Sequence, residues 1–371
     1  MSVRIERRLT QPRWLIVAVP VGSLALAFGL MALVLVATGH SPGHTYSRLF
    51  DAAFIAKGAL SNTFTSATPL AFTGLAAAVA FRMQLFNIGG EGQLYFGAIG
   101  AAGAALVVGG NSTTVLVLVM VLAGAASGAF WALIPGLLRA FLKTNEIITS
   151  LMLNYVAALI IDYLIFDSHS YWRANKGFEA SVFPQGKPLP TAASWPTTSI
   201  SGAVVPLGFL IAILAAIVIW VLYSRTRFGF EVKVIGDSSR AARYAGMRTS
   251  RKIVAVMCIS GAIAGIGGAS QDGDFRHLLD PRGLVASGYG YSGIVVAALG
   301  RYNPFAAVLV AFLLGGLQTA GYTLQGADFP AGLVGVMQGL ILFSALGGEL
   351  LVRYRVRVGR RSSTGPVSAA A

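Results

Sequence analysis

The sequence predicts an all-α membrane protein, a polytopic bundle of about ten transmembrane helices. Of its 371 residues, 55% are hydrophobic and only 11% are charged, whereas a soluble domain carries about 25% charged residues. Its apolar runs also approach the roughly 20 residues that cross the hydrocarbon core of a bilayer. The chain therefore lacks the charge to coat a water-exposed globule, and its surroundings include membrane lipid.

Hydropathy divides the chain into an amino-terminal segment, 1–13, a membrane domain, 14–350, and a tail, 351–371. The first apolar run is too long for a typical signal-peptide core, so we expect it to be a retained span. Pro69 and Pro135 fall inside spans, where proline bends a helix. The ten spans are expected near 14–37, 58–80, 88–109, 115–138, 146–166, 205–223, 253–270, 284–300, 303–322 and 331–350.

The basic residues set the expected orientation. With the amino terminus inside, 21 of the 28 Lys and Arg residues fall in cytoplasmic segments, as the positive-inside rule requires. That rule also accounts for the net charge of +14, so we expect no nucleic-acid partner. Both termini are then cytoplasmic.

One cytoplasmic loop, 224–252, is compact, strongly basic and rich in helix-forming residues. A much simpler loop would be enough to connect two spans. The composition of this loop therefore indicates a docking surface for a soluble partner. The alternative is a basic loop that only fixes orientation. On the other side, the external segment 167–204 is long and rich in Pro and aromatic residues. It is either a docking surface for an external partner or a structured cap.

The third span opens with an unusual stretch, FNIGGEGQLY, at 86–95. Its glycines disfavour a regular helix, and Glu91 is costly at depth in lipid. Irregular backbone survives there only where protein or a water-filled cavity covers it, so the stretch is either a pathway or gate element or a cap at the cytoplasmic interface. The candidate pathway residues in it are Asn87, Gly90, Glu91 and Gln93.

A second glycine-rich region, at 283–300, is weakly similar to the first and is either a second pathway element or an external hairpin. Internal repeats are common in transporters. Two glycine pairs spaced four apart have a simpler explanation, because small residues at this spacing let helices approach closely. These pairs are Gly124 with Gly128 and Gly261 with Gly265.

The fifth span carries a polar stripe with a period of four residues, which lies along one side of a helix. Such a stripe is expected to face the bundle interior rather than lipid. Asn154 either bonds a neighbouring helix or lines a pathway, and Ser150 is also a candidate pathway residue. The stripe consists of Glu146, Ser150, Asn154, Ala158 and Asp162.

Motifs for chemistry are missing from the sequence. It contains no GxxxxGK[ST] loop, HExxH or CxxC, and Cys258 is the single cysteine. We therefore predict no catalytic residues, no metal site and no cofactor.

Three stretches resemble the permease subunits of bacterial ABC importers for nucleosides and simple sugars, most nearly the larger nucleoside permease. They are FNIGGEGQLYFGAIGA at 86–101, TNEIITSLMLNY at 144–155 and GDSSRAARYAGM at 236–247. The resemblance implies the ABC importer permease fold, the bacterial plasma (inner) membrane and alternating access. It also implies a cytoplasmic ATPase subunit that hydrolyses ATP, a second permease in a heterodimer and an extracytoplasmic substrate-binding lipoprotein.

In this resemblance the stretch 236–247 corresponds to the coupling helix that sits in a groove of the ATPase. Ser238 and Ser239 replace an expected Asn-Pro pair, and Asp237 or Ser238 is expected to cap the helix. The residues carried over to ATPase coupling are Gly236, Asp237, Arg240, Ala241, Arg243, Tyr244, Ala245 and Gly246.

Three alternatives remain. A permease for ribose or another simple sugar has the same architecture, and the FNIGGEGQ and LNY stretches favour nucleosides over it. An ion-coupled secondary transporter needs buried ionisable residues, for which Asp162 is a weak candidate, and leaves the basic loop without a role. A membrane scaffold leaves the polar stripe of the fifth span unexplained.

Overall fold

The computed structural model describes residues 2–7, 13–175, 183–324 and 332–359. The described chain is mostly helical and forms two compact units. The first unit comprises Met1–His40 with Gly335–Ala371, and the second is Ser41–Val334.

The first unit brings the two ends of the chain together. Strand β1 (Ser2–Arg7) pairs antiparallel with β4 (Tyr354–Gly359), and Ser2 lies opposite Gly359. The long helices α1 (Arg13–Ala37) and α15 (Leu333–Arg353) adjoin these strands in the sequence. Part of the predicted tail is therefore a strand, and positions 360–371 of that tail lie outside the described residues.

The second unit holds the remaining elements. Its β2 and β3 form a two-stranded antiparallel sheet. In chain order the unit contains α2 (Pro42–Phe50), η1 (Asp51–Ile55), α3 (Ala59–Phe81), α4 (Gly90–Val108), α5 (Thr113–Leu142), α6 (Glu146–Asp162), η2 (Tyr163–Asp167), η3 (Thr191–Ala193), β2 (Thr197–Ile200), β3 (Ala203–Pro206), α8 (Leu207–Arg225), α9 (Arg227–Asp237), α10 (Ser239–Tyr244), α11 (Thr249–Ser270), η4 (Gln271–Arg276), α12 (Pro281–Ser287), α13 (Tyr289–Leu299) and α14 (Pro304–Thr323).

Among the described residues, seven helices are long and apolar enough to cross a membrane. They match seven of the predicted spans, and Pro69 and Pro135 lie inside α3 and α5 as expected. The predicted spans 14–37 and 331–350 correspond to α1 and α15. These seven spans are Ala59–Phe81, Gly90–Val108, Thr113–Leu142, Glu146–Asp167, Leu207–Arg225, Thr249–Arg276 and Pro304–Thr323.

The range 284–300 differs from the predicted single span. It is divided into α12 and α13 at Gly288, whose φ of +58° is left-handed. The eleven residues of α13 extend about 16 Å at about 1.5 Å per residue, which is about half of the hydrocarbon thickness. Helix α13 is therefore a half-helix that begins inside the bundle.

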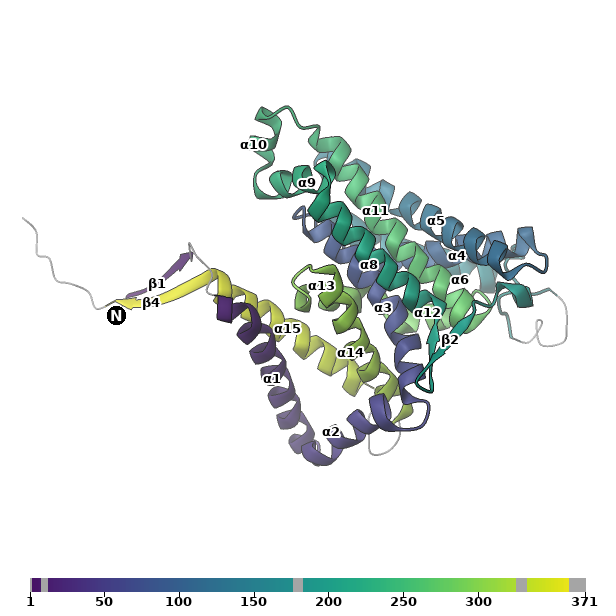
Figure 1. Cartoon of the computed structure of the whole chain (residues 1–371), viewed down its shortest axis with the longest axis horizontal. Coiled ribbons are helices and arrows are strands. Elements are labelled where there is room, and N and C mark those ends of the chain that lie inside the picture. Colours follow the sequence, from purple (N-terminus) through teal and green to yellow (C-terminus); the bar gives the residue numbers. More distant parts are fainter. Residues whose placement is uncertain (1, 8–12, 176–182, 325–331, 360–371) are drawn as a thin grey trace, which may run out of the picture. The chain divides into compact units, whose positions relative to one another are not determined.

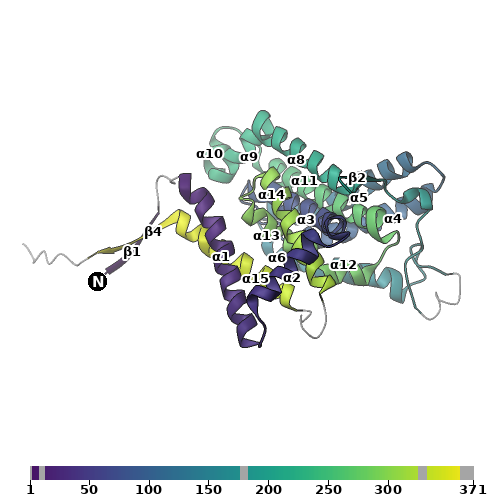
Figure 2. The same cartoon turned by 60° about the horizontal axis from the view of Figure 1, so that its bottom comes forward.

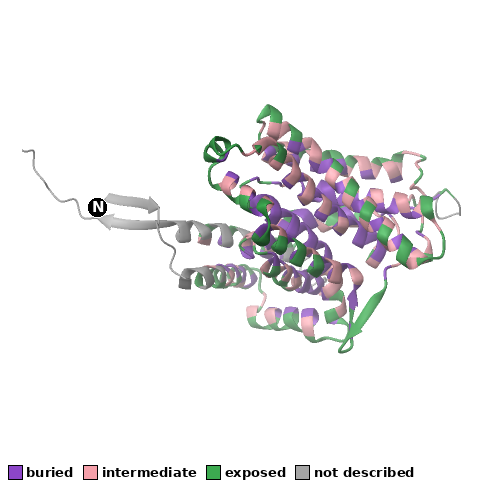
Figure 3. Cartoon of the chain, turned by 45° about the horizontal axis from the view of Figure 1, so that its top comes forward, coloured by how far each residue is buried: buried purple, intermediate pink, exposed green. Residues whose placement is uncertain are grey.

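Helix α3 forms the centre of the second unit and packs against α8, α11, α13 and α14 (Figures 1 and 2). Buried residues gather inside the helix bundle (Figure 3). Helices α5 and α11 approach closely through the predicted glycine pairs: a Cβ on Gly128 would collide with backbone atoms of Gly261 and Gly265. Their predicted role in packing is confirmed.

Arginines mark one end of this bundle, which we call the basic end. There the Arg82 Nε donates to the Tyr302 carbonyl oxygen at 3.3 Å, and the Arg82 guanidinium lies over the Tyr223 ring. Arg139 forms an ion pair with Glu146 at 3.1 Å, where α6 begins. The basic end provides a reference from which depth along each helix can be measured.

Candidate functional site

The first turn of α4 meets the first turn of α13 through a buried carboxylate. Glu91 is 2% exposed, and its Oε2 accepts hydrogen bonds from the backbone N–H groups of Gly290 and Tyr291, the latter at 3.2 Å. Its Oε1 accepts from the Tyr95 hydroxyl at 2.7 Å. A carboxylate at a helix N-terminus satisfies free N–H groups and is stabilised by the helix dipole. Glu91 therefore caps α13.

Only glycine fits at position 290. A Cβ there would collide with the backbone N and Cα of Glu91, so the two helices approach at backbone distance. On the other side of α13, the Tyr289 carbonyl oxygen accepts from the Thr73 hydroxyl of α3 at 2.9 Å. We call this contact between the first turns of α4 and α13 the α4–α13 junction.

Asn154 of α6 binds the other side of α4. Its Oδ1 accepts from the Gly92 N–H at 2.9 Å, and its Nδ2 donates to the Ile88 carbonyl oxygen at 2.9 Å. The same Nδ2 lies 3.4 Å from the Tyr291 hydroxyl oxygen. One amide therefore holds the entry to α4 and reaches α13, so the predicted bond from Asn154 to a neighbouring helix is confirmed.

The loop before α4 is held by a second set of polar side chains. The Asn87 Nδ2 donates to the Gln93 Oε1 at 3.0 Å and to the Ser260 hydroxyl at 2.9 Å. The Gln93 Nε2 returns a bond to the Asn87 Oδ1, and the Ile88 N–H donates to the Ser150 hydroxyl at 3.2 Å. These polar groups satisfy the irregular backbone, as membrane depth requires.

The junction lies deep along the helices. Tyr291 precedes Arg301 of the basic end by ten residues, and Thr73 precedes Arg82 by nine. At about 1.5 Å per residue both separations are about 15 Å, half of the roughly 30 Å hydrocarbon core. Both estimates place the junction about half of a membrane thickness from the basic end.

All six predicted pathway residues are buried. Gly90 and Glu91 lie at the α4–α13 junction. Asn154 binds the other side of α4, and Asn87, Gln93 and Ser150 hold the loop before it. Of the polar stripe on α6, Glu146, Ser150 and Asn154 are buried, whereas Ala158 and Asp162 are only half-buried. The stripe is therefore buried in the first half of α6 and becomes partly exposed toward the end of the helix. Sequence reasoning missed Tyr95 and Ser260. Tyr291 belongs to the GYGYSG stretch at 288–293, for which a second pathway element was one of the two interpretations.

The predicted coupling residues lie in the short helices α9 and α10 and in the turn that follows α10, beyond the ends of α8 and α11 (Figure 1). Seven of them are exposed, and Gly236 is half-buried. Ser238, one of the two expected caps, accepts from the Ala241 N–H at 3.2 Å and begins α10. Gly246 follows α10 with a φ of +74°, a conformation that glycine adopts at little cost and that ends helices. Tyr244, at 88% exposed, projects from a helix with two defined ends.

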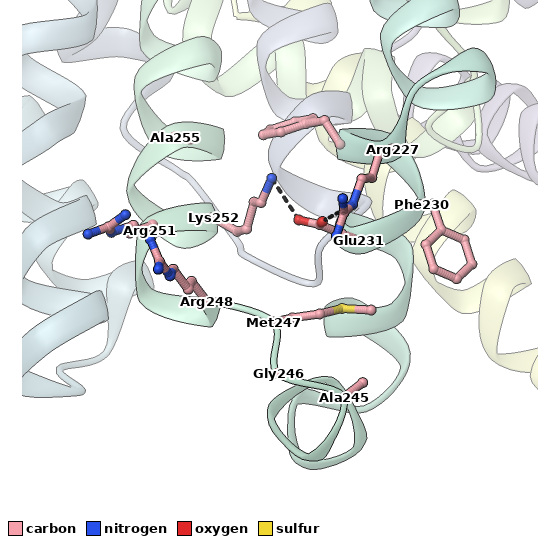
Figure 4. A pocket seen from close by; sticks show the side chains of 11 residues that line it. Arg227, Phe230, Glu231, Ala245, Gly246, Met247, Arg248, Arg251, Lys252 and Ala255 are labelled. Atoms are coloured by element: carbon pink, nitrogen blue, oxygen red, sulfur yellow. Dashed lines mark hydrogen bonds and ion pairs between the residues drawn. The ribbon is translucent and has the colours of Figure 1, made fainter.

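Glu231 of α9 makes two ionic contacts, one with Lys252 of α11 and one with Arg227 of its own helix. The Glu231 Oε2 lies 2.7 Å from the Lys252 Nζ, and the Oε1 lies 3.1 Å from the Arg227 Nε. Figure 4 shows both cations pointing toward this carboxylate, whereas Phe230 turns away from it. Lys252, through its hydrogen bond, lowers the pKa of Glu231, and Arg227 acts in the same direction. A cavity of about 540 Å³ adjoins these contacts and is lined by α9, α11 and the segment that follows α10.

The described part of the external segment packs onto the membrane helices. The Trp195 N–H donates to the Gly273 carbonyl oxygen at 2.9 Å, and the Leu189 N–H donates to the His277 carbonyl oxygen at 2.9 Å. The Trp172 indole N–H donates to the Ile99 carbonyl oxygen of α4, also at 2.9 Å. These bonds form a structured cap, as one of the two interpretations expected. Positions 176–182 of the segment lie outside the described residues.

Comparison of the sequence with known proteins shows which family the chain is similar to. A family model described as "Branched-chain amino acid transport system / permease component" matches residues 59–346. The chain is 33% identical to the glucose ABC transporter permease protein TsgB13 of Haloferax volcanii, over 100% of this chain and 98% of that protein. It is 31% identical to the nucleoside ABC transporter permease protein NupB of Lactococcus lactis, over 88% and 90% of the two chains. It is 32% identical to the guanosine ABC transporter permease protein NupP of Bacillus subtilis, over 87% and 91%. No solved structure matches.

Proposed function

Because the chain belongs to the permease-component family of branched-chain amino acid transport systems, we propose that it is the transmembrane permease subunit of an ATP-driven nucleoside importer. The protein is a multi-pass protein of the plasma membrane. Alternating access in this proposal moves the substrate through the membrane domain, 14–350, while 1–13 and 351–371 stay in the cytoplasm. The observation that carries the proposal is the exposed, doubly capped α10 at the basic end.

Helix α10 is suited to transmit force from a cytoplasmic ATPase. The Ser250 hydroxyl, in the first turn of α11, donates to the Ala140 carbonyl oxygen of α5 at 3.2 Å. The Glu231–Lys252 contact ties α9 to the same turn of α11. A push on exposed Arg240, Arg243 or Tyr244 therefore reaches α5 and α11 through short, rigid connections. ATP is hydrolysed on the separate ATPase subunit.

The substrate is proposed from the relatives. Two of the three named above are nucleoside or guanosine permeases, and the stretches at 86–101 and 144–155 favour this class. The relative that matches the whole chain is a glucose permease, so a simple sugar is the second candidate. In both cases an external binding lipoprotein delivers the substrate, and a second permease completes a heterodimer.

The α4–α13 junction is the proposed gate of the pathway. The start of the half-helix α13 meets the start of α4 there near the middle of the bilayer, and discontinuous helices with this placement form the substrate sites of many transporters. The broken α12–α13 pair, together with α1 and α15, would bring the seven long spans to about ten passes.

The experiment is uptake by the complete transporter carrying Arg243→Ala together with Tyr244→Ala. Loss of the α10 contact surface should lower guanosine uptake at least about tenfold while ATP hydrolysis and membrane insertion persist, because the motor remains intact but uncoupled. Lys233→Ala, a change at an exposed position on α9, is the matched control and should transport normally. Full guanosine uptake by the double variant would contradict the coupling role, and uptake of glucose without guanosine would select the second candidate.

A further inference from the structure

Two tyrosines break the apolar surface of the bundle at an unexpected depth. Tyr155 of α6 is 59% exposed, and Tyr291 of α13 is 40% exposed. The face of α6 around Tyr155 is otherwise apolar and exposed, with Met152, Val156 and Leu159 beside it. A polar aromatic pair on such a face requires an explanation.

The depth of these two side chains in the bilayer determines whether water or lipid tails surround them. Tyr155 lies nine residues from Glu146 and twelve from Asp167, the two ends of its span. At about 1.5 Å per residue it stands about 14 Å from the basic end, and Tyr291 stands at about 15 Å by its distance from Arg301. Both hydroxyls are thus near the middle of the bilayer, whereas lipid-facing tyrosines gather at the two membrane surfaces.

Other exposed tyrosines of the chain follow that ordinary rule. Tyr163 is 58% exposed and lies in the last turns of the same span, and Tyr322 is 55% exposed and lies in the last turn of α14. Tyr155 and Tyr291 are exceptions because a hydroxyl in hydrocarbon finds no water to bond. Their exposed faces are therefore expected to border a polar route and not lipid tails.

The two tyrosines also belong to one local arrangement. The Tyr291 hydroxyl lies 3.4 Å from the Asn154 Nδ2, and Asn154 precedes Tyr155 on α6. Behind them, the Tyr291 N–H is held by Glu91 at 3.2 Å. The junction thus fixes one ring, and α6 presents the other beside it.

We propose that Tyr155 and Tyr291 form the substrate-contacting surface of the translocation route and stack against the base of a nucleoside. This inference rests on the proposed function and names the residues that distinguish a nucleoside from a sugar. Aromatic rings stack on any base because every base has a π face, and a sugar without a base offers no such face. The Asn154 amide next to the rings holds Tyr291 in place rather than contacting the substrate.

Guanosine uptake by the complete transporter tests the assignment. Tyr155→Ala and Tyr291→Ala should each lower uptake at low substrate concentration by about tenfold or more, the effect of losing one stacked base. Tyr155→Phe and Tyr291→Phe keep the ring and should retain most of the uptake. Tyr163→Ala, on the same helical span, is the matched control and should transport as the wild type does.

The outcomes separate this assignment from the proposed function. If both alanine variants take up guanosine at the wild-type rate, the assignment of the two tyrosines is wrong, whereas the proposed function still stands. A wild-type transporter that takes up no nucleoside overturns the proposed function and base stacking with it. Equal losses in the phenylalanine and alanine variants also contradict stacking, because the ring would not be the feature that matters.

Thiol labelling gives a second reading that does not depend on which substrate is carried. Tyr155→Cys and Tyr291→Cys, each in a Cys258→Ala background, should react with a water-soluble thiol reagent, and guanosine should slow the reaction. Reaction with a lipophilic reagent alone would mean a lipid-facing surface. Reaction with neither reagent would mean a contact with the second permease. Either result overturns the assignment.

Discussion

The Glu91 carboxylate accepts the backbone N–H of Gly290, a residue 199 positions away in the sequence. Gly288, the N-cap residue of α13, has no side chain with which to cap the helix, so α4 supplies the acceptor instead. A free N–H near the middle of a bilayer is costly because no water reaches it. The first turns of α4 and α13 are therefore stable only as a pair.

Removing the carboxylate should destabilise this pair. Glu91→Ala leaves the Gly290 and Tyr291 N–H groups and the Tyr95 hydroxyl without their acceptor, and a buried unsatisfied group costs about 1–3 kcal/mol. We expect the free energy of unfolding in detergent to fall by at least that amount. Glu91→Gln keeps an acceptor oxygen and should fall less. Equal losses in the two variants would contradict capping as the role of Glu91.

Gly290→Ala adds only one methyl group, but it should destabilise the folded protein more than a change of this size usually does. The added Cβ would collide with backbone atoms of Glu91, which cannot move without shifting α4, and overpacking of this kind costs about 1–3 kcal/mol or more. A lower yield of folded protein and a lower Tm should follow. In Gly43→Ala the new Cβ meets nothing within 4 Å, so this control should leave the Tm unchanged or slightly higher.

Much of the fold could be predicted because hydropathy and local caps are properties of short segments. Seven spans and the Ser238 cap followed from neighbouring residues alone. The break at Gly288 did not, because a window that averages hydropathy cannot distinguish one apolar span from two short helices. The acceptor that makes this break tolerable is Glu91, which no local pattern near 288 reveals.

The sequence predicted which residues belong to the candidate site, but it did not predict which groups these residues contact. The stripe on α6 placed Ser150 and Asn154 on the interior side, and both are buried there. Their partners are backbone groups of Ile88, in the irregular loop before α4, and of Gly92, in the first turn of α4, and the sequence does not specify such contacts. Tyr155 belongs to the LNY stretch that favours nucleosides, but the sequence did not predict a role for this side chain, because it is distinguished only by its depth and exposure.

Asn154 should tolerate few replacements because its amide donates and accepts at once. Asn154→Asp keeps the acceptor for the Gly92 N–H but directs a carboxylate oxygen at the Ile88 carbonyl, which is repulsive. Asn154→Leu removes both bonds and leaves two buried backbone groups unsatisfied, at about 1–3 kcal/mol each. Both variants should lower the Tm, whereas Met152→Leu at an exposed position of the same helix should not. An unchanged Tm in Asn154→Leu would contradict the bonding described here.

The contact between Glu231 and Lys252 predicts a defined response to pH. Since Lys252 lowers the pKa of Glu231 from its ordinary 4.5, the carboxylate favours the folded arrangement fully at any pH above 4.5. This stabilisation is lost as the pH falls below 4.5 and through the lowered pKa. Amide hydrogen exchange in α9, corrected for its intrinsic pH dependence, should therefore be constant from pH 6 to 8 and rise on acidification. Glu231→Gln should show the raised exchange already at pH 7, whereas Lys233→Gln, exposed on the same helix, should match the wild type. Equal protection of α9 in the wild type and Glu231→Gln at pH 7 would show that this carboxylate does not fasten α9 to α11.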